Sequence, residues 1–108
     1  MEGVHRPVLL KEVLEELKVK DGNWYIDATL GDGGHSLEIL KAGGKVIGIE
    51  VDPEALKRAK GRFGELGKLE RLGEFKLIQG NFRDLKKLLK DNGAENLRFS
   101  GILYDLGV

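Results

Sequence analysis

The residues best suited to chemistry form a glycine-rich segment followed by an acidic one. Gly31-Asp32-Gly33-Gly34-His35-Ser36 follows an apolar run that begins at Trp24. Glycine lets a backbone approach a ligand closely because it has no Cβ and tolerates positive φ. Glu50 comes 19 residues after Gly31, at the end of a second apolar run, which is about the spacing that brings a carboxylate to a ribose in a nucleotide-binding βαβ unit. The two features together predict a site for a nucleoside-containing cofactor.

The same segment narrows the kind of cofactor. No Lys-Ser or Lys-Thr pair follows the glycines, so this is not the phosphate-gripping loop of P-loop proteins. NAD-binding loops use a third glycine for helix packing, whereas Gly33-Gly34-His35-Ser36 occupies that place here. The departure favours a cofactor without a pyrophosphate. An NAD-dependent oxidoreductase half-domain remains an alternative.

Other candidate residues each have a structural explanation as well as a functional one. Glu50 could be solvated, but Asp52 already serves as the N-cap of the following helix, which favours a ribose contact for Glu50. His35 could bond its own helix start or contact the cofactor. Phe82 could belong to the core or flank an adenine ring, and Asp105 ends an apolar strand where an unpartnered carboxylate is costly. The two histidines are far apart in the sequence and there is no cysteine, so the sequence does not support a metal site. No residue is assigned to catalysis.

Strands and helices are predicted to alternate along the chain. A helix opens at Pro7, and further helices follow Ser36, Asp52-Pro53 and Asn81, with a frayed helix end and a loop across residues 61–74. The apolar, β-branched runs predict strands over residues 24–30, 45–51, 75–80 and 100–108. This alternation indicates an α/β fold with a parallel sheet and right-handed crossovers. The candidate residues then converge at the carboxyl ends of the strands, where such sheets bind ligands.

The length and composition of the chain limit its domain number, its partners and its class of protein. The 108 residues, 41% of them hydrophobic, suffice for one domain over residues 1–108. Eighteen basic and eighteen acidic residues cancel, so no global field attracts nucleic acid or a membrane. The absence of cysteine and of a long apolar run predicts a soluble, cytoplasmic protein. The basic residues between Lys57 and Arg71 are interleaved with acidic residues, which favours a solvated surface over a contact with RNA.

The chain resembles the bacterial S-adenosylmethionine-dependent methyltransferases that modify N4 of a cytosine in 16S ribosomal RNA. The resemblance runs over nearly the whole chain, in the family's order and spacing. It is carried by five segments: His5-Arg6-Pro7-Val8-Leu9-Leu10, Asp27-Ala28-Thr29-Leu30-Gly31-Asp32-Gly33-Gly34-His35-Ser36, Gly48-Ile49-Glu50-Val51-Asp52-Pro53, Gly80-Asn81-Phe82 and Gly101-Ile102-Leu103-Tyr104-Asp105-Leu106-Gly107-Val108.

The resemblance implies a Rossmann-like class I methyltransferase fold and S-adenosylmethionine as cofactor. It implies cofactor contacts at Gly33, Gly34 and His35, at Glu50 on the ribose, at Phe82 near the adenine, and at Asp105. Many members carry aspartate where this chain has Glu50, which keeps the carboxylate and changes its reach. For the complete enzyme it implies direct methyl transfer to the cytosine amine, with Asp105 or a backbone carbonyl as a candidate acceptor of its N–H. The partner would be 16S rRNA or the small ribosomal subunit.

Members of this family continue beyond Asp-Leu-Gly-Val, so the chain is expected to hold the cofactor-binding N-terminal part. In the strand order three-two-one-four, a fold truncated after the fourth strand leaves that strand as an apolar edge, which can pair with another chain. We therefore expect either a fragment of a larger enzyme or a homo-oligomer formed through this edge. A non-catalytic nucleotide-binding or self-associating α/β module is the alternative function.

Overall fold

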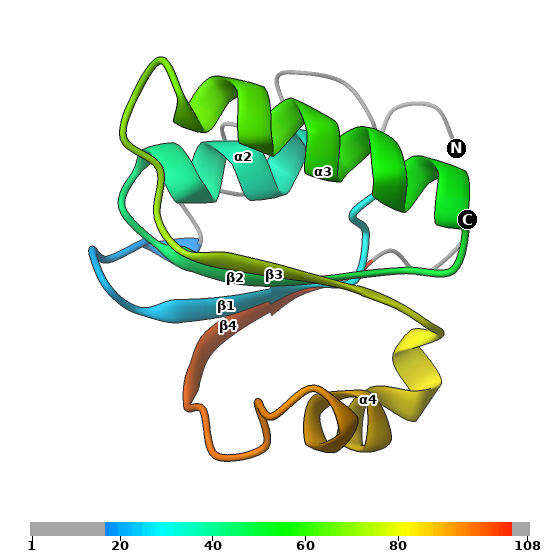
Figure 1. Ribbon diagram of the computed structural model, residues 1–108. Coiled ribbons are helices and arrows are strands. Elements are labelled where there is room, and N and C mark those ends of the chain that lie inside the picture. Colours follow the sequence, from blue (N-terminus) through cyan, green and yellow to red (C-terminus); the bar gives the residue numbers. More distant parts are fainter. Residues whose placement is uncertain (1–16, 105–108) are drawn as a thin grey trace.

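The computed structural model describes residues 17–104, which form one sheet with helices on both faces (Figure 1). The predicted helix at Pro7 and the candidate Asp105 lie outside these residues. The elements in chain order are β1 (Trp24–Asp27), α2 (Gly34–Lys41), β2 (Lys45–Glu50), α3 (Pro53–Gly67), β3 (Phe75–Gln79), the 3-10 helix η2 (Phe82–Asp84), α4 (Leu85–Asp91) and β4 (Phe99–Leu103).

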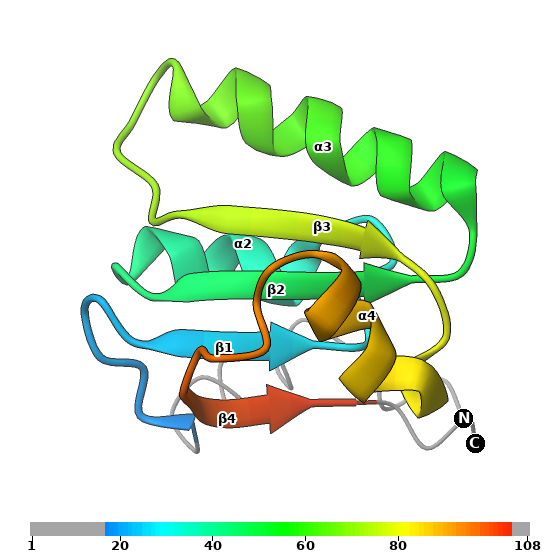
Figure 2. The ribbon, with the colours of Figure 1, turned by 60° about the horizontal axis from the view of Figure 1, so that its bottom comes forward.

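The four strands are parallel and lie in the order β3-β2-β1-β4, as predicted (Figure 2). Ile26 of β1 pairs with Ile47 of β2 on one side and with Ile102 of β4 on the other. Among the described strands, β1 and β2 are therefore central. The fold is α/β, and the glycine segment leaves the carboxyl end of a central strand.

The alternation of side chains along the strands builds two cores. Helices α2 and α3 cover one face of the sheet, and α4 covers the other (Figure 1). Tyr25 and Val46 point into the first core, where they meet Phe63 of α3. Ile26 and Ile47 point into the second core, toward α4. Because successive strand residues face opposite sides, one short buried strand serves both layers.

Helix ends follow the predicted capping signals. The Asp52 side chain accepts a hydrogen bond from the Glu54 N–H, with Pro53 in the first turn of α3. Asn81 caps η2 by accepting from the Arg83 N–H. Gly43 and Gly93, with φ of 92° and 70°, take left-handed conformations after α2 and α4, which is where glycine ends a helix.

Several predicted boundaries were wrong. Helix α3 continues to Gly67 instead of fraying near Gly61, because its apolar face packs on the sheet through Ala59 and Phe63. Strand β1 ends at Asp27, three residues early, since the Asp27 carboxylate accepts the Thr29 N–H and turns the chain. The other three strands also end earlier than predicted: β2 ends at Glu50, β3 ends at Gln79, and β4 covers Phe99–Leu103.

Candidate functional site

The glycine segment forms a tight turn between β1 and α2. Gly33 is the N-cap of α2 and has a φ of 91°, while Gly31 has a φ of 50°. The Gly33 N–H donates to the Leu30 carbonyl at 2.6 Å. A Cβ on Gly33 would lie 2.6 Å from the Phe63 ring of α3. Glycine at this position is therefore required by both the backbone conformation and the packing of α2 near α3.

Glu50 joins the end of β2 to the same turn. Its Oε1 accepts a hydrogen bond from the Gly31 N–H at 2.8 Å, and its Oε2 accepts from the Asp52 N–H at 3.0 Å. The side chain is half-buried at the carboxyl edge of the sheet. The carboxylate that the spacing predicted for a ribose is thus held against the glycine segment.

Asp27 makes a network of hydrogen bonds that the sequence did not reveal. Its side chain is fully buried. Oδ1 accepts from the Thr29 N–H at 2.8 Å and from the Thr29 hydroxyl at 2.6 Å, and Oδ2 accepts from the Ser36 hydroxyl at 2.6 Å. An aspartate on the inward face of an apolar strand, with a serine at the following helix start, was the signal that could have identified it.

Phe82 lies past the end of β3 and meets an aromatic residue from the far edge of the sheet. Its ring stacks on Tyr104, with centroids 5.4 Å apart and planes 14° from parallel. Phe82 also packs against the second core. Both predicted explanations of this residue, core and ligand contact, remain compatible with its half-buried ring.

The remaining glycine-segment candidates lie on the first turn of α2. Gly34 and His35 are half-buried. The Gly34 N–H donates to the Asp32 carboxylate at 3.3 Å. A Cβ on Gly34 would meet only Asp32, at 3.8 Å, so this glycine faces open space. The structure thus brings Gly33, Gly34, His35 and Glu50 to one edge.

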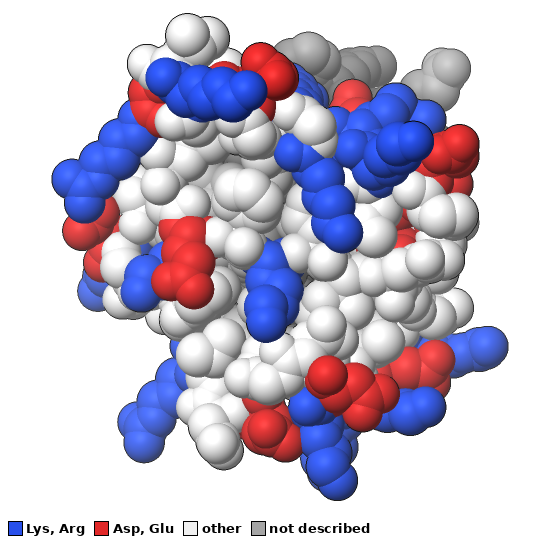
Figure 3. All heavy atoms as spheres, in the orientation of Figure 1, with Lys and Arg blue, Asp and Glu red and all other residues white. Residues whose placement is uncertain are grey.

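The face of the fold seen in Figure 3 carries charges of both signs. Basic and acidic side chains are interspersed over the face drawn in Figure 3. Arg62 of α3 lies 3.9 Å from the Asp32 carboxylate and donates to the Asp32 carbonyl at 3.3 Å. The glycine segment therefore carries an acidic side chain, with one arginine beside it.

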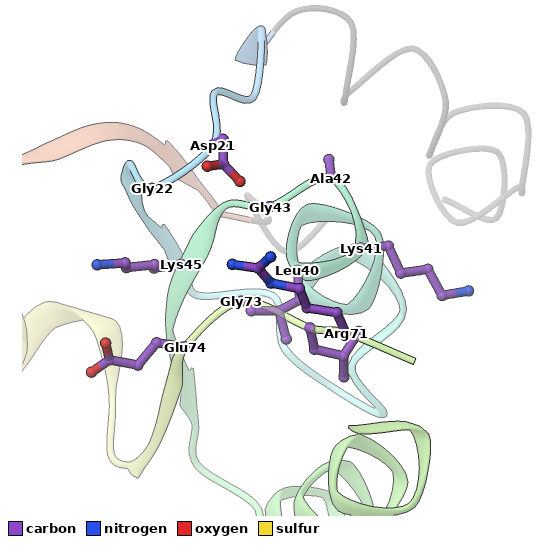
Figure 4. A pocket seen from close by; sticks show the side chains of 11 residues that line it. Asp21, Gly22, Leu40, Lys41, Ala42, Gly43, Lys45, Arg71, Gly73 and Glu74 are labelled. Carbon is purple, nitrogen blue, oxygen red and sulfur yellow. The ribbon is translucent and has the colours of Figure 1, made fainter. Parts of the chain in front are cut away.

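A hollow of about 440 Å³ lies at the opposite, amino-terminal end of the sheet (Figure 4). Its walls are the turns before β1, β2 and β3. A hydrogen bond from the Gly22 N–H to the Gly43 carbonyl joins the first two turns, and one from the Gly73 N–H to the Leu40 carbonyl ties the third to α2. Arg71 reaches toward Gly43, while Lys41 and Lys45 extend away from each other. None of the predicted site residues lines this hollow.

Within residues 17–104, no cluster of three or more His, Asp or Glu side chains is arranged to hold a metal ion. No helix in this part of the chain combines the length and apolar character needed to cross a membrane.

Comparison with known proteins identifies the family of the chain. Residues 2–108 match the model of the MraW methylase family. The chain belongs to this family. Family relatives include the ribosomal RNA small subunit methyltransferases H of Carboxydothermus hydrogenoformans, 43% identical over the whole chain, and of Finegoldia magna, 42% identical over the whole chain. The chain spans about a third of the length of these relatives, 33% in each case.

Solved structures agree with the family assignment at the level of the fold. An rRNA methylase from Streptococcus thermophilus has a TM-score of 0.69 at 22% identity, covering 96% of this chain and 57% of that one. A SAM-dependent methyltransferase from Aquifex aeolicus has a TM-score of 0.56 at 24% identity, covering 74% of this chain and 45% of that one. The fold of this MraW-family chain is therefore the Rossmann-like methyltransferase fold.

Proposed function

We propose that this chain binds S-adenosylmethionine and forms the cofactor-binding part of an enzyme that methylates N4 of a cytosine in 16S ribosomal RNA. The contact that carries the proposal is the 2.8 Å hydrogen bond from the Gly31 N–H to Glu50 Oε1. It joins the carboxylate expected to hold a ribose to the turn expected to lie along the cofactor. Membership of the MraW methylase family supports the reaction class, and the relatives named as ribosomal RNA small subunit methyltransferases H support the substrate.

The charge at this edge suits S-adenosylmethionine better than a dinucleotide. Asp32 is an exposed carboxylate within the glycine segment, and Arg62, 3.9 Å away, offsets only part of its charge. The remaining negative charge would repel a pyrophosphate. The ammonium and sulfonium groups of S-adenosylmethionine are positive, so the same carboxylate would attract them. When bound, this cofactor supplies a methyl group activated by its sulfonium.

The residues of the chain would hold the cofactor from three sides. Each Glu50 oxygen accepts one backbone N–H, which leaves lone pairs for two ribose hydroxyls. Gly34 and His35 would border the cofactor where the chain turns into α2. Phe82 would flank the adenine from the end of β3. Gly33 would act mainly by allowing this turn, and a contact from Asp105 follows from the family resemblance.

Calorimetric titration of the chain with S-adenosylmethionine and with NAD tests the cofactor. We expect saturable binding of S-adenosylmethionine at one site and none of NAD. Tighter binding of NAD would instead support the oxidoreductase alternative. If the chain bound neither S-adenosylmethionine nor NAD, the cofactor proposal would be refuted.

Catalysis and the RNA partner belong to the whole enzyme. Transfer of a labelled methyl group from S-adenosylmethionine to small ribosomal subunits, measured for this chain and for a full-length relative, tests them. We expect the relative to be active and its Asp105→Asn counterpart to lose turnover or cofactor affinity. As an enzyme of ribosomal RNA, it would act in the cytoplasm.

A second candidate function is a self-associating or nucleotide-binding module without catalysis. One observation favours it: β4 lies at the edge of the described sheet, with 44% of Ile102 and 55% of Tyr104 exposed. Methyl transfer by the chain alone would exclude this candidate.

A further inference from the structure

The buried carboxylate of Asp27 needs an explanation that the cofactor contacts do not supply. Asp27 is fully buried, and the three hydrogen bonds described for it come from an amide and two hydroxyls, not from a basic side chain. A carboxylate removed from water is costly unless its oxygens are bonded. Here the donors are neutral, so burying an apolar side chain in this space would cost less free energy than burying the carboxylate.

The network connects the two ends of the glycine segment. Thr29 lies just before the glycines, and Ser36 lies in the first turn of α2. Both donate to the same carboxylate, one to each oxygen. Glu50 holds the middle of the segment through the Gly31 N–H. The turn is thus bonded at its entry, its middle and its exit by side chains of the chain itself.

We infer that Asp27 is a positioning residue: it holds the glycine segment in the shape that the cofactor requires. The inference rests on the proposed function. A direct contact between Asp27 and the cofactor is disfavoured by geometry, because the carboxylate is inaccessible and both of its oxygens are bonded within the chain. Without the network, binding would have to order the turn, and that cost would appear as weaker affinity.

Two variants and two controls test this role. Ser36→Ala removes the donor to Oδ2, and Asp27→Asn replaces an acceptor with an amide that can donate. Thr29→Ser keeps both bonds to Oδ1. Ile78→Val trims a buried residue of the other core, and such a change typically costs about 1 kcal/mol of stability. This last variant separates general destabilisation from loss of the network.

The first measurement is amide hydrogen exchange over residues 28–36, which needs no ligand. We expect Ser36→Ala and Asp27→Asn to speed exchange there by about 10-fold, since local opening becomes easier. Thr29→Ser and Ile78→Val should leave it within about twofold of the parent chain. Unchanged exchange in both network variants would overturn the inference.

The second measurement is the affinity for S-adenosylmethionine. We expect Ser36→Ala to weaken it by about 10-fold and Asp27→Asn by more. The double variant should be no weaker than Asp27→Asn alone, because the two residues act as a unit. Equal losses in Ile78→Val, or parent-like affinity in the network variants, would overturn the inference. A parent chain that binds no S-adenosylmethionine refutes the proposed function instead, and exchange still shows whether Asp27 holds the turn. If Asp27→Asn does not fold, Ser36→Ala decides.

Discussion

Glu50 Oε1 lies 2.8 Å from the backbone nitrogen of Gly31, so the end of β2 is bonded directly to the turn that follows β1. The same carboxylate accepts the Asp52 N–H through its other oxygen. One side chain therefore fixes the glycine segment, shapes the entry to α3 and presents an acceptor at the carboxyl edge of the sheet. A residue that makes these contacts should tolerate little change in charge.

Neutralising Glu50 is expected to weaken cofactor binding. Glu50→Gln places an amide where both carboxylate oxygens now accept backbone N–H groups. We expect affinity for S-adenosylmethionine to fall by about 10- to 100-fold in Glu50→Gln, as for hydrogen bonds to charged groups. Titration calorimetry measures this. Asp52→Asn, which keeps the helix cap, is the control and should bind like the parent; equal binding by Glu50→Gln would contradict the ribose assignment.

Alanine should have opposite effects at two glycines. Gly33→Ala forces a side chain into the left-handed region and against the Phe63 ring, so we expect the free energy of unfolding to fall by about 2 kcal/mol or more. Gly61→Ala adds a methyl group in open space within α3 and should raise it by about 1 kcal/mol. Urea unfolding curves measure both. A Gly33→Ala chain as stable as its parent would show that Phe63 can move away.

Tyr104 is expected to orient Phe82 by stacking on it. Tyr104→Ala removes a pair worth about 1 kcal/mol, and the freed Phe82 ring should bind S-adenosylmethionine several-fold more weakly. Tyr104→Phe keeps the stacked ring and serves as the control. The readout is the ratio of the dissociation constants for S-adenosylmethionine of Tyr104→Ala and Tyr104→Phe. Equal constants would mean that Phe82 is held by the core alone.

Self-association through β4 remains a prediction. Sedimentation velocity at micromolar concentration should detect a dimer, and Ile102→Lys should abolish it because a charge blocks pairing at a sheet edge. Leu69→Lys makes the same replacement at another exposed apolar side chain, away from β4, and should leave the dimer intact. A monomer in every case would rule out this edge as an interface of the chain.

Much of the fold could be predicted because local and global signals agree. Asp52-Pro53 and Asn81 begin helices as their side-chain chemistry requires, and Glu50, the last residue of β2, is bonded to the glycine segment. Parallel pairing of β1 with β2 brings those distant positions to one edge. The strand order itself came from the family resemblance, since alternation of elements alone does not distinguish one order from another.

The errors come from interactions between segments that are distant in the sequence. Gly61, Gly64 and Gly67 suggested a frayed helix, but burial of Phe63 against the sheet outweighs their low propensity. From the sequence, Asp27 was named only within a segment that carries the family resemblance. Its role depends on Ser36 meeting it across the turn, a contact that spacing does not reveal. The stack of Phe82 on Tyr104 joins opposite edges of the sheet and is equally invisible in the sequence.

The strand order also has a consequence for how the chain folds during synthesis. Trp24 pairs with Lys45 on one side, 21 residues later, and with Phe99 on the other, 75 residues later. Closing a longer loop costs more entropy, so β1, β2 and β3 should pair before β4 joins them. The Asp27 network and the Glu50 contact lie entirely within residues 27–52. The glycine segment can therefore take its final shape on a nascent chain whose fourth strand has yet to leave the ribosome.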